Sequence, residues 1–141
     1  MQLATTLPLV GLIWTIQLVH YPLFDRVGAE AFARYHADHA RLITPLVGPL
    51  MIVELMAAMT TLRWPSARVP EGFGLAMLAL LGVAWATTAL LSVPAHNALA
   101  QGFDAAVHSR LVSTNAIRTA AWTARGALLL WALTRAERLG D

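Results

Sequence analysis

Four long apolar segments constrain the fold of this chain more than any other feature. They cover residues 3–21, 44–62, 73–93 and 111–133. A helix needs about 20 largely apolar residues to cross the hydrocarbon core of a bilayer, and each segment meets that length. Prolines lie near several segment ends, where they disturb a helix least. The sequence therefore predicts an all-α fold, an integral membrane four-helix bundle that forms one transmembrane domain over residues 1–141.

The composition agrees with a membrane protein and excludes several classes of function. Hydrophobic residues make up 57% of the chain and charged residues only 13%, a balance that is unusual for a soluble domain. The absence of cysteine rules out disulfides, thiolate-bound metals and iron–sulfur clusters. The basic residues are all arginines and form no basic patch, so nucleic acid is not an expected partner. The first apolar segment lacks the basic start and cleavage site of a signal peptide, so we expect it to remain as a membrane helix.

Two polar connections lie at the same end of the predicted bundle. Residues 23–43 contain the stretch RYHADHARL, whose helical spacing predicts an interfacial helix between the first and second spans. Residues 94–110 form a similar connection between the third and fourth spans. Arginines are divided evenly between the two faces, but the short turn at 63–72 and the acidic residues at the other face favour cytoplasmic termini. We expect a protein of the bacterial inner membrane with both termini in the cytoplasm; a homo-oligomer is compatible with so small a bundle.

All five histidines fall at the end that carries these two connections. Imidazole is the commonest protein ligand for transition metals, and a bundle collects ligands from several helices at one depth. His36 and His39 are three residues apart, which places their Cβ atoms about 5–6 Å from each other on one side of a helix. Copper and iron suit imidazole and carry out redox chemistry. The sequence thus predicts a transition-metal site with its ligands among His20, His36, His39, His96 and His108. Histidines also collect at membrane interfaces because they are amphipathic, and that interface role is the alternative.

The fourth segment carries a stripe of polar side chains. An arginine that faces lipid near the bilayer centre costs about 2.5–3.5 kcal/mol, so the stripe is expected to face the bundle interior or a water-filled cavity. Depths counted along the helices place Arg118 level with Glu54 of the second span, which predicts an ion pair between them. Arg125 has no obvious acidic partner in this arrangement. The stripe consists of His108, Leu111, Asn115, Arg118, Trp122 and Arg125, at intervals of three and four residues.

Two interpretations of this stripe stay open. In the first, the charged pair only fixes the packing of the second span against the fourth. In the second, the polar side chains also line the floor of a catalytic site, where they hold a polar group of the substrate or relay protons. The candidate catalytic residues are then Glu54, Asn115, Arg118 and Arg125.

Two stretches carry a resemblance to a known family. VPAHNALAQGFD follows the third span, and TNAIRTAAWTARG lies in the fourth. With its size and span pattern, the chain resembles the anthrone-oxygenase-like family of small four-span membrane proteins over its whole length. The resemblance places Asn97 after the third span and an Asn-x-x-Arg-Thr pattern at Asn115, Arg118 and Thr119. It implies oxygenation or oxidation of a small aromatic or apolar substrate, and it does not extend to the histidine-rich insert. A fainter likeness in size and membrane histidines links the chain to haem-linked membrane oxidases.

Three functions are compatible with these features. The first is a metal-dependent membrane oxidoreductase whose small apolar substrate enters between helices. The second is a b-type haem or electron-transfer protein, in which His20 and His96 would be the axial ligands and arginines would hold the propionates. The third is a scaffold or small-solute transport subunit without a reactive site.

Overall fold

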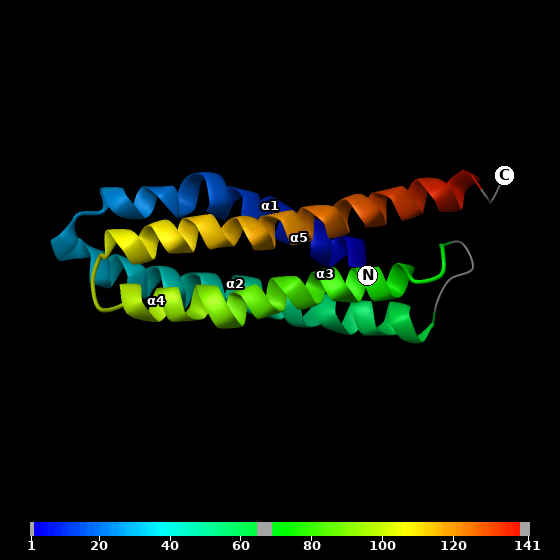
Figure 1. Cartoon of the computed structure of the whole chain (residues 1–141), viewed down its shortest axis with the longest axis horizontal. Coiled ribbons are helices and arrows are strands. Elements are labelled where there is room, and N and C mark those ends of the chain that lie inside the picture. The colour runs from blue at the N-terminus through cyan, green and yellow to red at the C-terminus, as the bar shows by residue number, and fades with distance from the viewer. Residues whose placement is uncertain (1, 65–68, 139–141) are drawn as a thin grey trace.

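The chain forms four helical rods that run side by side and reverse direction at each connection (Figure 1). The computed structural model describes residues 2–64 and 69–138. The described residues contain no β-strand, so the all-α prediction is confirmed. Contacts join α1 to α2, α2 to α3, α3 to α5 and α5 to α1, which closes the rods into a four-helix bundle. The elements in chain order are α1 (Gln2–Thr15), the π-helical turn η1 (Ile16–His20), the 3₁₀ turn η2 (Pro22–Arg26), α2 (Ala29–Arg63), α3 (Phe73–Thr87), the π-helical turn η3 (Thr88–Ser92), α4 (Val93–Leu99) and α5 (Ala105–Arg138).

Three helical segments of the described chain are long and apolar enough to cross a membrane: Gln2–Arg26, Ala29–Arg63 and Phe73–Leu99. Helix α5 has 34 residues but does not meet the same hydropathy criterion, because the polar stripe around Arg118 and Arg125 lowers its mean hydropathy. The membrane character of the chain is therefore consistent with the structure, whereas the fourth predicted span is not confirmed by composition.

The second predicted span is part of a much longer helix. α2 runs without interruption from Ala29 to Arg63, so RYHADHARL is its N-terminal portion and not a separate interfacial helix. That prediction was wrong because Pro45 and Pro49 were taken to open the span, whereas both lie inside the helix. Prolines are tolerated within membrane helices, where neighbouring groups compensate for the lost backbone hydrogen bonds.

Two wide helical turns lie at the end of the bundle that carries the histidines. In η1 the backbone N–H of Tyr21 donates to the carbonyl of Ile16 at 3.0 Å, and in η3 the N–H of Val93 donates to the carbonyl of Thr88. These five-residue hydrogen bonds define π-helical turns, which are often found at functional sites. Because a helix turns about 100° per residue, one extra residue in a turn redirects every side chain that follows it. The two turns therefore set the direction of His20, Tyr21 and His96.

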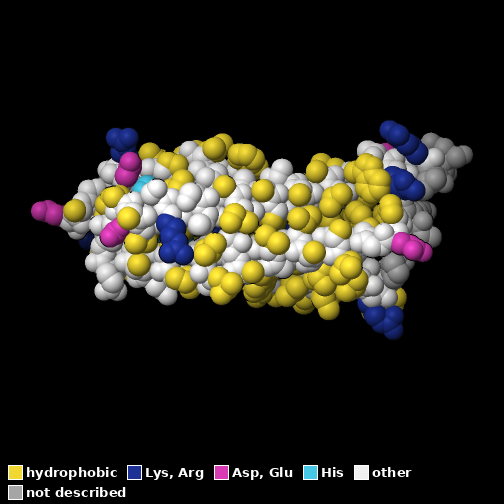
Figure 2. Space-filling view, viewed as in Figure 1, with side chains coloured by type: hydrophobic (Ala, Val, Ile, Leu, Met, Phe, Trp, Pro, Cys, Tyr) yellow, Lys and Arg dark blue, Asp and Glu magenta, His cyan; other side chains and the backbone are white. Residues whose placement is uncertain are grey.

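The surface of the bundle suits an apolar surrounding in its middle part. Charged side chains gather toward the two ends on the face seen in Figure 2, and yellow apolar groups dominate between them. Large aliphatic side chains are strongly exposed on several helices, among them Leu18 at 65%, Leu75 at 62% and Leu90 at 71%. Exposed apolar surface of this extent is favourable in contact with lipid and unfavourable in water.

Candidate functional site

Four imidazoles and one phenol meet inside the bundle at the end that carries η1 and α4. His20 ends η1, His36 and His39 lie on α2, and His96 lies on α4. The centroid of the His96 ring is 5.2 Å from that of His36 and 5.5 Å from that of His39. We call this group, together with Tyr21, the histidine cluster: His20, Tyr21, His36, His39 and His96. The structure thus brings together four of the five histidines that the sequence predicts as metal ligands, and their role as ligands stays a prediction.

Direct hydrogen bonds between ring nitrogens connect the members of the cluster. His20 Nε2 is 2.7 Å from His39 Nδ1, and His36 Nε2 is 2.9 Å from His96 Nδ1. The Tyr21 hydroxyl is 2.9 Å from His96 Nε2. Each N···N contact requires one nitrogen to donate and the other to accept, because two bare lone pairs or two N–H groups would repel. The cluster therefore consists of a His20–His39 pair and a Tyr21–His96–His36 chain.

The tyrosine–histidine chain ends at an atom that has no partner. His36 is only 2% exposed, and its Nδ1 is one of the few buried side-chain atoms without a hydrogen-bond partner among the described residues. A buried polar atom without a partner costs about 1–3 kcal/mol, so native structures keep few of them. The unpaired Nδ1 of His36 lowers the stability of the folded protein, and unfavourable features of this kind are typical of functional sites.

His108, the fifth histidine, lies beside the cluster and not within it. Its Nε2 is 2.8 Å from the backbone carbonyl of Tyr21, and its ring stacks on Phe24 at a centroid distance of 6.3 Å. Phe24 is fully buried and also contacts the rings of His20 and His39 edge-on. His108 and Phe24 thus hold the turn that carries His20 and Tyr21. Sequence reasoning missed Tyr21 and Phe24 because their inward direction depends on the π-helical turn.

The predicted five-histidine metal site is not present as a preformed ligand set. No three His, Asp or Glu side chains in residues 2–64 and 69–138 are arranged so that they could hold one ion. The reason lies in the contacts described above, since the ring nitrogens of the cluster are hydrogen-bonded to one another. The haem alternative meets a similar obstacle, because the four rings are packed together and a porphyrin between His20 and His96 would have to separate them.

Arg118 lies one layer further into the bundle without a carboxylate partner among the described residues. Its Nη1 donates to Ser92 Oγ at 3.2 Å and to Asn115 Oδ1 at 3.3 Å, and its Nε has no partner. The guanidinium also lies 5.3 Å from the ring centroid of Trp122, within cation–π range. Asn115 in turn donates to Gln17 Oε1 at 2.9 Å. Arg118 also lies close to Tyr21 of the cluster, and Asn115 contacts Arg118 and Gln17; a catalytic role for Asn115 or Arg118 stays a prediction.

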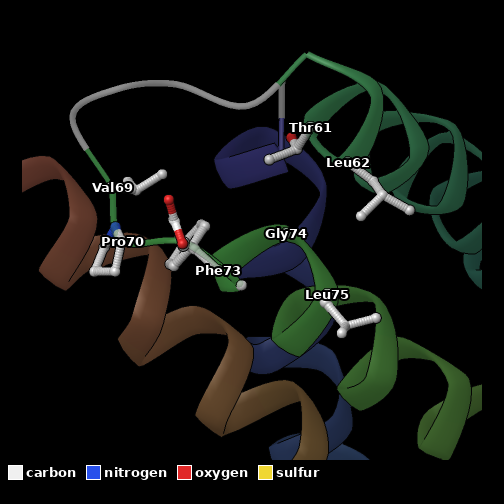
Figure 3. Close-up of a pocket in the computed structure, with 9 residues that line it drawn as sticks. Thr61, Leu62, Val69, Pro70, Phe73, Gly74 and Leu75 are labelled. Atoms are coloured by element: carbon white, nitrogen blue, oxygen red, sulfur yellow. The ribbon is translucent and has the colours of Figure 1, made fainter.

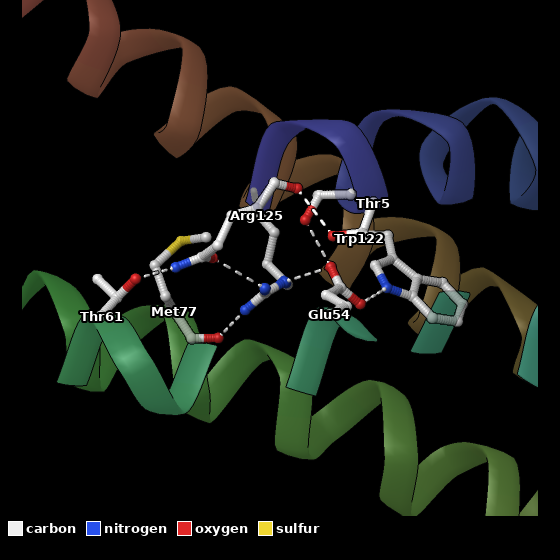
Figure 4. A network of polar contacts seen from close by, with 8 residues as sticks. Thr5, Glu54, Thr61, Met77, Trp122 and Arg125 are labelled. Carbon is white, nitrogen blue, oxygen red and sulfur yellow. Dashed lines mark hydrogen bonds and ion pairs between the residues drawn. The ribbon is translucent and has the colours of Figure 1, made fainter. Parts of the chain in front are cut away.

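Glu54 and Arg125 form a separate, fully buried network in the middle of the bundle (Figure 4). Arg125 Nε donates to Glu54 Oε1 at 3.0 Å, and both side chains have an exposure of 0%. Thr6 donates to the same carboxylate oxygen at 2.6 Å, and Trp122 Nε1 donates to Glu54 Oε2 at 2.9 Å. Arg125 also donates to the carbonyl of Met77 and to the Gln2 side chain. This network joins α1, α2, α3 and α5, which is the arrangement of a structural clamp.

The predicted Glu54–Arg118 pair is wrong, because the carboxylate pairs with Arg125 instead. The prediction measured depth from Pro45 on one helix and from His108 on the other. Since α2 is continuous, the histidines are the correct reference on both helices. Glu54 lies 15 residues after His39, or about 22 Å, and Arg125 lies 17 residues after His108, or about 26 Å. These two depths match, whereas Arg118 lies only 10 residues, about 15 Å, from His108. A catalytic role for Glu54 or Arg125 stays a prediction without a contact to the cluster.

A groove on the outer surface of the bundle leads to the histidine cluster. It lies between the first rod and α2 and has a volume of about 460 Å³. Its walls are mainly aliphatic, and one end is formed by His20, Tyr35, Asp38 and His39. Ligand sites usually have volumes of about 300–1,000 Å³ with mostly apolar walls and a few polar groups. We call it the lipid-side groove, and it is lined by Leu12, Thr15, Ile16, Val19, His20, Tyr35, Asp38, His39, Leu42, Ile43 and Leu46.

A second pocket lies at the opposite end of the bundle, where α2 ends and α3 begins (Figure 3). It has a volume of about 300 Å³, and Thr61, Pro70 and Phe73 are among its lining residues. Among the described residues that line it, only Glu71 is ionisable, so these residues provide no group of side chains for acid–base or metal chemistry. The candidate site is therefore the histidine cluster with its groove.

The fold and the site together define a helical bundle of membrane type with a buried histidine cluster. No protein-family model matches this chain, and no curated protein or solved structure is significantly similar to it. The resemblance to the anthrone-oxygenase-like family stays a prediction.

Proposed function

We propose that this chain is a membrane-embedded oxidoreductase that acts on a small apolar or aromatic substrate at the histidine cluster. The observation that carries the proposal is the meeting of four imidazoles and a phenol from three rods at the end of an apolar groove. In this proposal α5 crosses the bilayer as a fourth span, with its polar stripe sheltered by the other three rods. The protein lies in a bacterial inner membrane with its termini in the cytoplasm and the cluster near the other face.

The chemistry of the cluster supports a reaction that moves protons. Oxidation of an apolar molecule that bears a hydroxyl group releases protons, which need acceptors inside a region without water. Imidazole is the side chain best suited to accept and pass on protons near neutral pH. The Tyr21–His96–His36 chain provides two hydrogen bonds in series, at 2.9 Å each, through which a proton can move by a change of tautomer. Arg118, bordering this chain without a carboxylate, favours negative charge that develops there.

Copper or iron, if bound, would suit these donors and would supply redox chemistry, with O₂ or a redox partner as the final electron acceptor. Imidazoles without thiolates suit both metals. The donors would be His20, His36, His39 and His96, and the unpartnered Nδ1 of His36 already offers one nitrogen in a buried position. Metal binding would replace the two N···N hydrogen bonds of the cluster. His108 is the least available donor, because its Nε2 contacts the Tyr21 carbonyl.

Metal content and the visible spectrum of the purified protein test this proposal. We expect close to one copper or iron per chain and no Soret band, and we expect a His36→Ala/His39→Ala variant to lose the metal. Arg34→Ala is the control, since it removes an exposed side chain from the same helix two residues before His36, and it should retain the metal. Full occupancy in the double variant would overturn the ligand assignment. A Soret band that disappears in His20→Ala or His96→Ala would favour the haem alternative, and absence of both metal and haem would favour the scaffold or transport subunit.

A further inference from the structure

We infer that the lipid-side groove binds an elongated amphiphile whose polar head is a hydroxyl group, such as an alkylphenol, with the hydroxyl at the His20–His39 pair. The binding concerns the metal-free protein, in which the His20–His39 hydrogen bond is intact, and it does not rest on the proposed function. Three properties of the groove support this inference: its length, its polarity and the hydrogen-bonding groups at one end.

The groove has one polar and one apolar end along the bundle axis. Its wall on the first rod runs from His20 to Leu12, eight residues or about 12 Å, and its wall on α2 runs from Tyr35 to Leu46, eleven residues or about 16 Å. Beyond the histidines the lining is aliphatic apart from Thr15, whose hydroxyl donates to the carbonyl of Gly11. A ligand that fills this space is therefore an aromatic or polar head with an apolar chain of about that length.

The groove opens toward the region that lipid would occupy. Val19, Leu42 and Leu46 border it with exposures of 51%, 61% and 52%. The groove is shallow enough to be entered sideways from a bilayer, since its aliphatic wall continues into the exposed surface of both rods. The ligand is thus a molecule that partitions into the membrane.

The His20–His39 pair selects the head group. His20 Nε2 and His39 Nδ1 use each other, which leaves His20 Nδ1 and His39 Nε2. Neither of these atoms has a hydrogen-bond partner among the described residues, and both residues line the groove, so in this inference the two nitrogens receive the head group. If His20 donates within the pair, its own Nδ1 is an acceptor and His39 Nε2–H is a donor; if His39 donates, the roles are exchanged.

An uncharged pair therefore presents one donor and one acceptor to the groove in either tautomer. A hydroxyl group, which donates one hydrogen bond and accepts another, is the smallest head that satisfies both. A methyl ether or a carbonyl accepts only, and it leaves the imidazole acceptor without a partner. No arginine is among the described residues that line the groove, and Asp38 at its polar end is an anion, so the groove disfavours an anionic head.

Binding of para-octylphenol and of its methyl ether, para-octylanisole, to the protein in lipid nanodiscs tests this inference. Binding is followed by titration with imidazole nitrogen NMR on histidine-labelled protein. We expect the phenol to bind about tenfold more tightly than the ether, the effect of one hydrogen bond to a buried acceptor, and to shift the His20 and His39 signals. Equal affinities for the two compounds would overturn the inference.

Two variants on adjacent residues test the location. Val19→Trp fills the groove and should weaken binding of both compounds about tenfold, whereas Leu18→Trp, on the neighbouring exposed position that does not line the groove, should leave both affinities within about twofold. His39→Phe should remove the preference for the phenol while the ether still binds. Unchanged binding in Val19→Trp would contradict the location. Phenol binding by a protein that contains no metal or haem would sink the oxidoreductase proposal and leave this site standing.

Discussion

At the scale of single residues, Glu54 shows which partners allow a carboxylate to be fully buried in this chain. Its carboxylate accepts hydrogen bonds from Thr6, Trp122 and Arg125 and is completely enclosed. A buried carboxylate is tolerated when an opposite charge and further donors replace the lost water. Arg118 differs from Arg125 because it has only neutral partners. Arg125 thus belongs to a structural ion pair, whereas Arg118 is a cation available to the site.

The clamp predicts a specific response to its removal. Glu54→Gln leaves Arg125 buried without a counter-charge and should lower the free energy of unfolding by about 3–5 kcal/mol. Trp122→Phe removes one hydrogen bond and should cost about 1 kcal/mol from that loss alone. Unfolding of the protein in mixed micelles, followed by circular dichroism, measures both. A Glu54→Gln variant as stable as the parent would show that the ion pair does not hold the bundle, and a Glu54→Leu/Arg125→Leu variant more stable than Glu54→Gln would support the charge argument.

Among the elements, α2 matters most, because it carries both the cluster and the clamp on one continuous helix. His36 and His39 lie near its start and Glu54 lies 15 residues further on. Pro45 and Pro49 have no N–H, so the carbonyls of Arg41 and Pro45 lose their usual helical partners. Packing against the other helices therefore keeps α2 helical although its two interior prolines disfavour a helix.

Replacement of these prolines tests the continuity of α2. Pro45→Ala and Pro49→Ala should each raise the free energy of unfolding by about 1 kcal/mol or more, because an interior proline costs a helix about 3 kcal/mol relative to alanine and neither position is buried. Pro22→Ala is the control, since Pro22 begins η2 and its missing N–H has no helical partner there; it should change stability by less than about 0.5 kcal/mol. Thermal unfolding in one detergent compares the three. Destabilisation by Pro49→Ala would mean that the bundle depends on a bend in α2.

At the scale of the whole molecule, polar groups are divided between two interior levels inside an apolar exterior. The histidine cluster lies at one end, and the clamp joins the rods in the middle. α5 packs against α1 and α3, and Arg125 reaches Glu54 of α2 across the interior. If α5 crosses the membrane as proposed, this burial keeps Arg118 and Arg125 out of contact with lipid.

Cysteine labelling tests this arrangement, because the chain contains no cysteine of its own. Gln101 and Glu71 are both exposed and lie in the connections at opposite ends of the bundle. In intact bacterial cells, Gln101→Cys should react with a membrane-impermeant maleimide, and Glu71→Cys should react only after permeabilisation. Labelling of both from outside would contradict the crossing of the bundle through the membrane, and the opposite pattern would invert the proposed orientation.

Several features were determined by the sequence alone. Apolar segments of about 20 residues are a local property, so the helical fold and the membrane character follow without knowledge of contacts. The same holds for the placement of the histidines at one end and for the inward direction of the stripe on α5, since a buried arginine must avoid lipid. These conclusions depend on periodicity and length, which neighbouring helices do not alter.

Only the tertiary structure decided which groups meet. The partner of Glu54 depended on the continuity of α2, which its prolines concealed, and the direction of Tyr21 depended on a π-helical turn that no residue pattern announces. The hydrogen bonds between His20 and His39 and between His36 and His96 join segments up to 60 residues apart. Each of these contacts is fixed by the rotation and relative height of packed helices. A shift of one helix by a single residue changes all of its later contacts with the other helices. Residue spacing therefore places the histidines at one end of the bundle but does not determine what their ring nitrogens contact.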